Sequence, residues 1–517
     1  MFLKKAFSGR LRVCFIISVL CIFAYRLLLI IEYCSRYSDD DQALMWYGTA
    51  LAGHFRLLEP HFLGQAYGSM LESVVAVPLY WLNVPLNICL PIATLFLWFV
   101  PIIICAIIVL NRNRKIAFGI LFVSILFGWD YDVLTAIPRS FIPGFSISFL
   151  GIALMLMGIE KNRLPECFLG PILLAIGFVS TETTIAVIGI WLLYLLLYRL
   201  KSATKNAIIT SIIGGCIGII IIYYCNKLFY ENNPEYMLHG RLSLSDVRVS
   251  IDVLHKNLTN NLIDLLRSFS VVNVGAVPII LLLIVCVVLY LIINQKEWKM
   301  LIVLLSLPVG LLLFLSLPKS LDFYDMLLFS QTRMFLFIPY CLIEVLMLLG
   351  LETTEGDYIT QKKTVYFITA FTVVVAITKC IVLEESVLKK QDLYLSAMVR
   401  VSDSDDLNQA ASVILDEANT TNCNTVVIVT DNRALGYATG AINYGKYISY
   451  NAHYDRRSST YLHLKESFID EDVLFVETVD DRVDKMYVEH ITGNLISYLR
   501  TNKNLQRYTS DNRYYIR

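Results

Sequence analysis

The sequence is short of charged residues: Asp, Glu, Lys and Arg make up only 17% of its 517 residues, against about 25% in an ordinary soluble domain. It also lacks a net charge, because 43 basic and 43 acidic side chains cancel. A chain that is 56% apolar, with a mean hydropathy of +0.61, is not a soluble globular enzyme. Its zero net charge gives no field that would attract nucleic acid, so no nucleic-acid partner is expected.

The few charges are concentrated near the C-terminus. Residues 385–517 contain 34 charged side chains in 133 positions, whereas the 384 residues before them contain 52. Of the twelve cysteines only Cys423 lies in this polar part, which excludes an intrachain disulfide there. The distribution predicts two domains: a membrane-embedded module, 1–384, and a water-soluble domain, 385–517.

Long apolar runs fill the first of these domains. Crossing a bilayer takes about 20 apolar residues in a helix, and such runs predict an all-α polytopic membrane protein with about eleven transmembrane helices. The stretch 70–83 is too short to cross, so we expect it to lie as an interfacial helix on the outer surface. The expected spans are residues 13–31, 87–110, 116–133, 141–159, 165–180, 184–199, 207–229, 274–293, 300–317, 334–350 and 364–383.

Basic clusters between the spans set the expected orientation. Lys and Arg prefer cytoplasmic loops, and here they precede the first span and recur on the same side of the membrane along the chain. The N-terminus is therefore expected in the cytoplasm, with an uncleaved first span. The first outer loop, 32–86, and the C-terminal domain are then extracytoplasmic.

The C-terminal domain has a mixed pattern. Helical periodicity covers residues 406–418, and short apolar runs at 425–430 and 473–476 are followed by polar or acidic residues. These patterns predict a helix and strands in a small α/β domain. The domain contains no GxGxxG, Walker, HExxH or paired CxxC sequence, which favours a lid or docking domain over a second active site.

Three adjacent carboxylates, Asp39, Asp40 and Asp41, follow the first span. Such a cluster either is a solvated loop that ends the helix or shares protons and binds a cation. The same loop continues with Trp46-Tyr47, His54, His61, Gly64-Gln65-Ala66-Tyr67-Gly68, Leu71-Glu72 and Pro78-Leu79-Tyr80-Trp81.

This order of residues resembles the first outer loop of the GT-C superfamily, membrane glycosyltransferases that use polyprenyl-phosphate sugars. The chain looks closest to the bacterial branch of protein mannosyltransferases and aminoarabinose transferases. The resemblance implies an inverting enzyme of the bacterial inner membrane, which moves a sugar from a lipid-linked donor to an acceptor hydroxyl on a glycan, lipid or protein. One of the three aspartates would be the general base, with Asp39 and Asp41 the leading candidates. The matching segment implies substrate contacts by Gln65, Tyr67 and Glu72.

The leaving phosphate requires cations at headgroup depth, where Arg binds phosphate through two hydrogen bonds. Arg333 opens a span and is followed by Pro339, similar to the Arg-aromatic-Pro pattern of the family's donor-phosphate contact. Further candidates for the substrate site are Arg139, Arg26, Lys379 and His61. Each basic side chain near a helix end alternatively extends to the interface without binding a ligand.

Carboxylates in other turns suggest further contacts. Asp130, in the turn Trp129-Asp130-Tyr131-Asp132, would form with Asp41 an all-oxygen site for Mg²⁺ or Mn²⁺. Since many lipid-phosphate-dependent members of the family need no metal, we expect either no cofactor or this cation. Glu182 either contacts substrate or caps a helix. Glu344 lies deep within a span and therefore needs a partner or a role.

Two other classes of protein compete with the transferase. A transporter or flippase of a lipid-linked glycan would show charged or broken helices at the midplane and a repeat that relates two halves of the chain. Glu344 is the main ionisable residue at such a depth, and no repeat is visible in the sequence. A sensor or assembly scaffold would leave the pattern between Asp39 and Glu72 unexplained.

Overall fold

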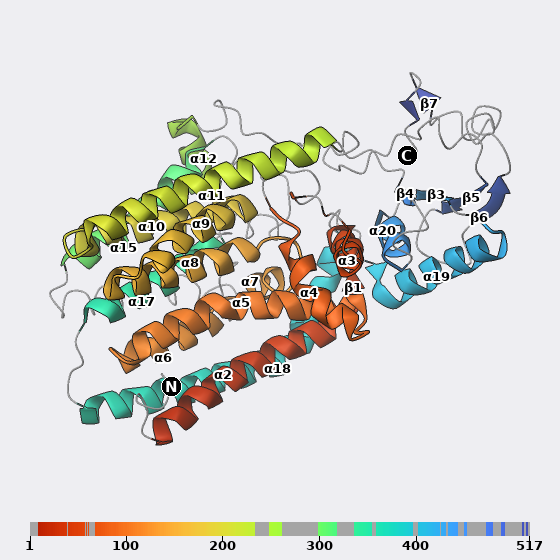
Figure 1. Cartoon of the computed structure of the whole chain (residues 1–517). Helices are drawn as coiled ribbons and strands as arrows, with labels where there is room; N and C mark the ends of the chain where they lie inside the picture. The colour runs from red at the N-terminus through yellow and green to blue at the C-terminus, as the bar shows by residue number, and fades with distance from the viewer. Residues whose placement is uncertain are drawn as a thin grey trace.

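The computed structural model describes residues 9–38, 40–56, 58, 60–61, 68–232, 248–260, 298–317, 336–353, 358–396, 402–423, 425–430, 433–442, 449–451, 472–478, 487–491, 509–510 and 513–514. Most of these residues form a bundle of roughly parallel helices, with a smaller group of helices and strands beyond one end of it (Figure 1). The first and last long helices, α2 and α18, lie side by side along one edge of the bundle.

Most helices of the bundle are built around an apolar run, and short turns connect several of them, such as α5 to α6 and α8 to α9. The N-terminal half contains α2 (Gly9–Leu29), η1 (Ile30–Cys34), α3 (Asp40–Gly53), α4 (Leu71–Trp81), α5 (Leu86–Leu110), α6 (Arg114–Ile125), α7 (Trp129–Leu134), α8 (Pro143–Lys161) and α9 (Leu164–Ser180). The remainder contains η3 (Glu182–Thr184), α10 (Ile185–Tyr194), η4 (Leu195–Arg199), α11 (Lys205–Asn232), α12 (Ile251–Asn260), α15 (Trp298–Leu315), α17 (Phe337–Glu352) and α18 (Tyr358–Ser396).

Within the described part of the chain, six helical segments are long and apolar enough to cross a membrane, so the chain is an integral membrane protein. Helices cover each predicted span except 274–293, which lies outside the described residues, and the total of about eleven stays a prediction. The span expected at 116–133 differs in form, because α6 ends at Ile125 and α7 begins after Gly128, whose extended backbone interrupts the helix. The crossing segments are Arg10–Cys34, Leu86–Leu110, Pro143–Lys161, Glu182–Arg199, Lys205–Asn232 and Lys362–Leu383.

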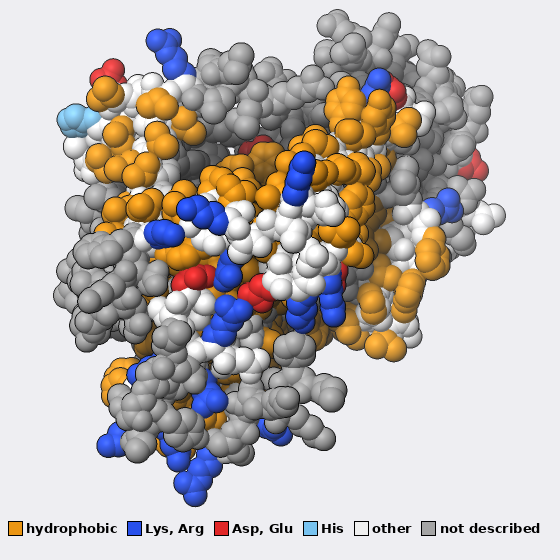
Figure 2. Space-filling view, turned by 60° about the vertical axis from the view of Figure 1, so that its left-hand side comes forward, with side chains coloured by type: hydrophobic (Ala, Val, Ile, Leu, Met, Phe, Trp, Pro, Cys, Tyr) orange, Lys and Arg blue, Asp and Glu red, His pale blue; other side chains and the backbone are white. Residues whose placement is uncertain are grey.

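The core of the bundle surrounds α17, whose side chains are all buried from Phe337 to Leu351. Small residues bring α8 and α9 close together: a Cβ on Gly151 would lie only 2.7 Å from the carbonyl oxygen of Gly170. Such contacts suit helices in lipid, where close van der Waals packing drives association. The outer surface is correspondingly apolar, and Figure 2 shows hydrophobic side chains over much of one face, with more Lys and Arg than Asp and Glu among them.

Ion pairs join the helices at the end of the bundle where α5 ends and α6 begins. Arg112 binds Glu160 at 2.6 Å, and Arg199 binds Glu352 at the same distance. The hydroxyl of Tyr194 also donates to Glu352. The basic side chains that the sequence analysis used to orient the chain are thus partly paired with carboxylates, and they connect α5, α8, η4 and α17.

Beyond the other end of the bundle lies a four-stranded sheet with two helices. Its strands are β3 (Thr425–Thr430), β4 (Ser449–Asn451), β5 (Val473–Thr478) and β6 (Tyr487–Ile491), in the order β4-β3-β5-β6. β3 is parallel to β4 and β5, and β6 is antiparallel to β5. The helices are α19 (Ser404–Thr420) and α20 (Arg433–Ile442), and a separate pair of short strands, β7 (Thr509–Ser510) and β8 (Arg513–Tyr514), follows.

These elements lie where the sequence patterns at 406–418, 425–430 and 473–476 predict them. The boundary predicted at 384/385 falls inside α18, which continues to Ser396. The helix continues because the polar residues after Leu383 include no Gly or Pro to end it. That residues 385–517 form an independent domain stays a prediction.

Candidate active site

Most described residues that the sequence analysis singled out lie at one end of the bundle, which we call the loop end. It comprises α3, α4, α7 and the adjoining ends of the long helices, and it is the end nearest to the sheet (Figure 1). The opposite end carries the ion pairs of Arg112 and Arg199. Three clusters of polar side chains, centred on Asp132, Ser140 and His61, build the loop end.

The acidic segment connects a short strand to a helix. β1 (Tyr37–Ser38) ends immediately before Asp39, which lies outside the described residues, and Asp40 and Asp41 open α3. The side chains of these two are likewise outside the described part of the chain. Carboxylates in the first turn of a helix are stabilised by its dipole, typically by 0.3 to about 1 kcal/mol. The assignment of the general base to one of the three aspartates stays a prediction.

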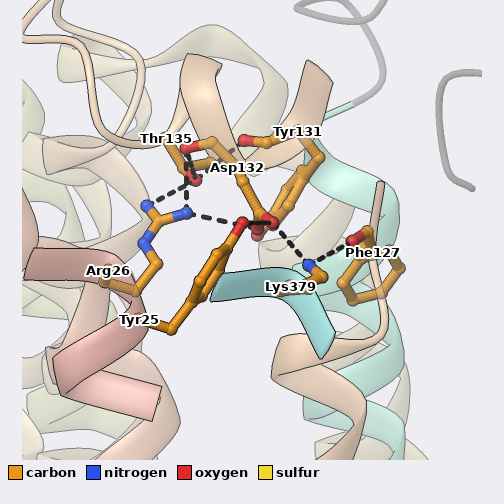
Figure 3. A network of polar contacts seen from close by, with 7 residues as sticks. All are labelled: Tyr25, Arg26, Phe127, Tyr131, Asp132, Thr135 and Lys379. Carbon is orange, nitrogen blue, oxygen red and sulfur yellow. Dashed lines mark hydrogen bonds and ion pairs between the residues drawn. The ribbon is translucent and has the colours of Figure 1, made fainter. Parts of the chain in front are cut away.

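Asp132, on α7, is the centre of a buried charge network (Figure 3). Arg26 on α2 donates to its carboxylate at 3.2 Å and to its backbone carbonyl at 2.8 Å. Lys379 on α18 donates to the same carboxylate and, at 2.6 Å, to the carbonyl of Phe127. The hydroxyl of Tyr25 donates to the carboxylate at 2.5 Å. The network therefore ties the first and last long helices to the turn between α6 and α8.

Two cations share one carboxylate in this network, so its formal charge is +1. The side chains of Arg26 and Asp132 are each 1% exposed and that of Lys379 is 5% exposed. The guanidinium of Arg26 also lies 4.2 Å from the ring centroid of Trp98, a cation–π contact that compensates part of its lost hydration. Arg26 and Lys379, which the sequence predicts as phosphate contacts, are thus brought together by Asp132. The sequence assigned no role to this aspartate.

Ser140 is the second centre, and it joins three turns at the loop end. Its backbone N–H donates to the carboxylate of Glu72 at 2.8 Å, and its carbonyl accepts from Thr181 at 3.2 Å. Its hydroxyl accepts a hydrogen bond from the backbone N–H of Ser69. The φ of Ser140 is +64°, in the left-handed region that only glycine adopts without strain. The three hydrogen bonds of Ser140 hold it in this conformation.

Glu72, on α4, is fully buried. It also accepts a hydrogen bond from Thr94 on α5 at 3.3 Å. Burial raises the pKa of Glu72 to about 8, and the hydrogen bonds from Ser140 and Thr94 limit the rise. Near neutral pH its carboxyl therefore holds a proton that an exposed glutamate would release.

His61 is held by the C-terminal part of α11. Its Nε2 lies 2.9 Å from Asn226 Nδ2, its Nδ1 lies 3.4 Å from the carbonyl of Gly68, and its ring stacks on Tyr230. Desolvation lowers the pKa of His61, and the carbonyl of Gly68 opposes this shift. The amide N–H of Asn226 requires an unprotonated Nε2, which leaves the proton on Nδ1. Both ring nitrogens are therefore occupied by protein contacts.

Other predicted site residues are outside the described part of the chain: Gln65, Tyr67 and Arg333, together with the side chain of Asp130. Among the residues that the structure does describe, no group of three His, Cys, Asp or Glu is arranged to hold a metal. The metal pair expected at Asp41 and Asp130 involves side chains outside that set and stays a prediction. Substrate contacts by the described candidates, Arg26, Arg139, Glu72, His61 and Lys379, also stay predictions.

Comparison with known proteins gives a match by structure alone: no family model and no curated protein matches the sequence. The fold is similar to the crystal structure of ArnT from Cupriavidus metallidurans in the apo state, with a TM-score of 0.50 and 10% identity. It is similar also to ArnT from the same organism bound to undecaprenyl phosphate, with a TM-score of 0.52 and 9% identity. In both cases the match covers 89% of this chain and 92% of the other. The chain therefore has a fold similar to that of ArnT.

Proposed function

We propose that the chain is a glycosyltransferase that moves a sugar from a polyprenyl-phosphate donor to an acceptor hydroxyl at the loop end of the bundle. The observation that carries this proposal is the similarity of the fold to that of ArnT over 89% of this chain. One of the two matching ArnT structures is bound to undecaprenyl phosphate. The acidic segment and several cations at the same end support it. We further propose that this end faces outward from a bacterial inner membrane.

The chemistry needs a base on one side of the sugar and a cation on the other. In the proposed reaction, Asp39 or Asp41 takes the proton of the acceptor hydroxyl while its oxygen attacks the anomeric carbon. The bond from that carbon to the phosphate oxygen breaks, and the lipid phosphate leaves with the electron pair. A single displacement of this kind inverts the anomeric configuration.

The leaving phosphate is proposed to be bound by Arg333 and Arg139, because Arg offers two parallel hydrogen bonds to phosphate. Arg26 and Lys379 already bind Asp132 directly. Arg26 and Lys379 are proposed to contribute through the excess positive charge of the Asp132 network. This charge stabilises a nearby anion such as the leaving phosphate. The carboxylate and guanidinium groups suffice for this reaction, so we propose that no metal is required.

The test is sugar transfer in reconstituted membranes from a panel of labelled polyprenyl-phosphate donors. Wild type is compared with Asp39→Asn, Asp41→Asn and Arg333→Ala, each checked for folding, and with Asp252→Asn as a control on exposed α12. Loss of transfer in one folded aspartate variant, with activity kept in Asp252→Asn, supports the proposal and identifies the base. If every donor stays intact while labelled lipid changes leaflet, the flippase alternative replaces the transferase.

A further inference from the structure

We infer that the C-terminal segment 402–442 positions the acidic segment of the active site and is not a detached lid over it. In this inference Ser404 is a positioning residue that acts through Ser38, immediately before the acidic segment. Helix α20 supports the acidic segment from its C-terminal side by packing against α3. The inference rests on the proposed function, because it assigns a catalytic consequence to a contact with the three aspartates.

The first support is a strand pair formed by residues far apart in the chain. β1 pairs antiparallel with β2 (Ser402–Asp403), so that Ser38 faces Ser402 across the pair. The backbone N–H of Ser404 donates to the carbonyl of Arg36 at 2.8 Å, and the hydroxyls of Ser38 and Ser404 share a hydrogen bond of 2.8 Å. Both serine side chains are 1% exposed, so water does not compete for this bond.

The second support is a hydrophobic core that crosses from the first loop to the C-terminal segment. Trp46 and Ala50 on α3 and Leu435 and Ala438 on α20 belong to one buried cluster. The two helices approach so closely that a Cβ on Gly440 would lie 3.1 Å from the ring of Tyr47. The same cluster includes Leu407, Ala411 and Ile414 of α19, Val426 and Ile428 of β3, and Leu474 and Val476 of β5.

The contact at β2 is itself held in place. Asp403 caps α19, because its carboxylate accepts from the backbone N–H groups of Asp405 at 2.8 Å and Asp406 at 3.4 Å. An N-cap of this kind typically contributes about 1 kcal/mol to helix stability. The strand that pairs with β1 therefore leads into a capped helix with one buried face, and a movement of Ser404 would have to move α19 with it.

The three aspartates lie between these two supports. Ser38 directly precedes Asp39, and Ala43, two residues after Asp41, is fully buried in the shared core. Asp40 and Asp41 belong to α3, so these contacts hold the described backbone on both sides of Asp39. Misplacing a catalytic group by 1 Å costs on the order of 100-fold in rate. Contacts that hold the backbone of the acidic segment should therefore affect the rate of sugar transfer.

The experiment measures hydrogen–deuterium exchange of peptides covering residues 37–44 and, on the same full-length preparations, sugar transfer. The variant is Ser404→Ala, the conservative variant is Ser404→Thr, and Ser412→Ala on the exposed face of α19 is the matched control. Gly440→Val is a second variant, which pushes a methyl group against Tyr47. Folding is followed by thermal unfolding in detergent, so that loss of the fold is recognised separately.

We expect Ser404→Ala and Gly440→Val to speed exchange in residues 37–44 by at least about tenfold. The transfer kcat should fall by about 10- to 100-fold with little change in donor KM, and Ser404→Thr and Ser412→Ala should behave as wild type. Unchanged exchange in Ser404→Ala overturns the inference. Faster exchange with an unchanged kcat overturns its catalytic part. If wild type transfers no sugar, the proposed function fails, while the exchange result still decides whether segment 402–442 holds the loop.

Discussion

Lys379 donates a hydrogen bond to Asp132, a residue 247 positions earlier in the chain. The contact brings the last long helix to the turn that follows α6, and Arg26 brings the first helix to the same carboxylate. The aspartate is the only anion of the described network, which makes its charge more critical than that of either cation. This imbalance gives the first prediction.

Asp132→Asn leaves two cations buried without their counter-ion. We expect it to destabilise the protein by about 3–5 kcal/mol, the usual cost of breaking a buried ion pair from one side. The double variant Asp132→Asn with Lys379→Met should recover part of the loss, because one of the orphaned charges is removed. Thermal unfolding in detergent measures both, with Asp416→Asn on the surface of α19 as the control. A double variant less stable than Asp132→Asn would contradict the charge argument.

Glu72 should make stability depend on pH. Its pKa is raised by burial from 4.5 to about 8, so between these values the folded chain keeps a proton that the unfolded chain releases. Stability then decreases as pH rises through this window and is highest below the unfolded pKa. Glu72→Gln lacks the titrating group but keeps an oxygen for the N–H of Ser140. The melting temperature of wild type should therefore fall more steeply from pH 5 to pH 8 than that of Glu72→Gln, and equal slopes would contradict the prediction.

Two substitutions of Ser140 can distinguish the cost of backbone strain from the cost of a lost hydrogen bond. Both Ser140→Ala and Ser140→Gly remove the hydroxyl that accepts from Ser69. Only glycine relieves the strain of a φ of +64°, which costs about 1 kcal/mol for other residues. We expect Ser140→Gly to be more stable than Ser140→Ala by roughly that amount in chemical or thermal unfolding. An alanine variant as stable as the glycine variant would show that the turn relaxes.

Glu344 is a buried carboxyl whose two side-chain oxygens have no hydrogen-bond partner among the described residues. An unsatisfied buried polar group costs about 1–3 kcal/mol, so replacing it with an apolar residue of similar size should stabilise the bundle. We expect Glu344→Met to raise the melting temperature and leave sugar transfer intact. A folded Glu344→Met protein without activity would instead assign the carboxyl a role in transport or catalysis.

Local patterns were sufficient for much of the fold. Apolar runs located the long helices, and the short run at 70–83 located α4, whose 11 residues are fewer than the roughly 20 that a crossing helix needs. The run Val426 to Val429, bounded by Thr at each end, identified β3. The resemblance of the first loop to the GT-C superfamily implied a fold of this kind, and the structure is similar to that of ArnT.

Relationships between distant segments were not predictable in this way. Nothing near Ser38 in sequence indicates that it pairs with Ser402, since a two-residue strand has no periodicity to read. The sequence prediction named Asp130, not Asp132, as the functional carboxylate of this turn. A single sequence does not show which of two carboxylates two positions apart contacts Arg26. The positive φ of Ser140 has no sequence signal either, as serine is not a residue that requires it.

The Asp132 network also bears on the order in which the protein is assembled. Arg26 and Asp132 are both synthesised well before Lys379, and their opposite charges cancel. Lys379 arrives 247 residues after Asp132 and adds a positive charge to a site that was neutral until then. A chain synthesised as far as Asp132 therefore contains a balanced pair, and the formal charge of +1 arises only with Lys379 on α18, which lies beside α2.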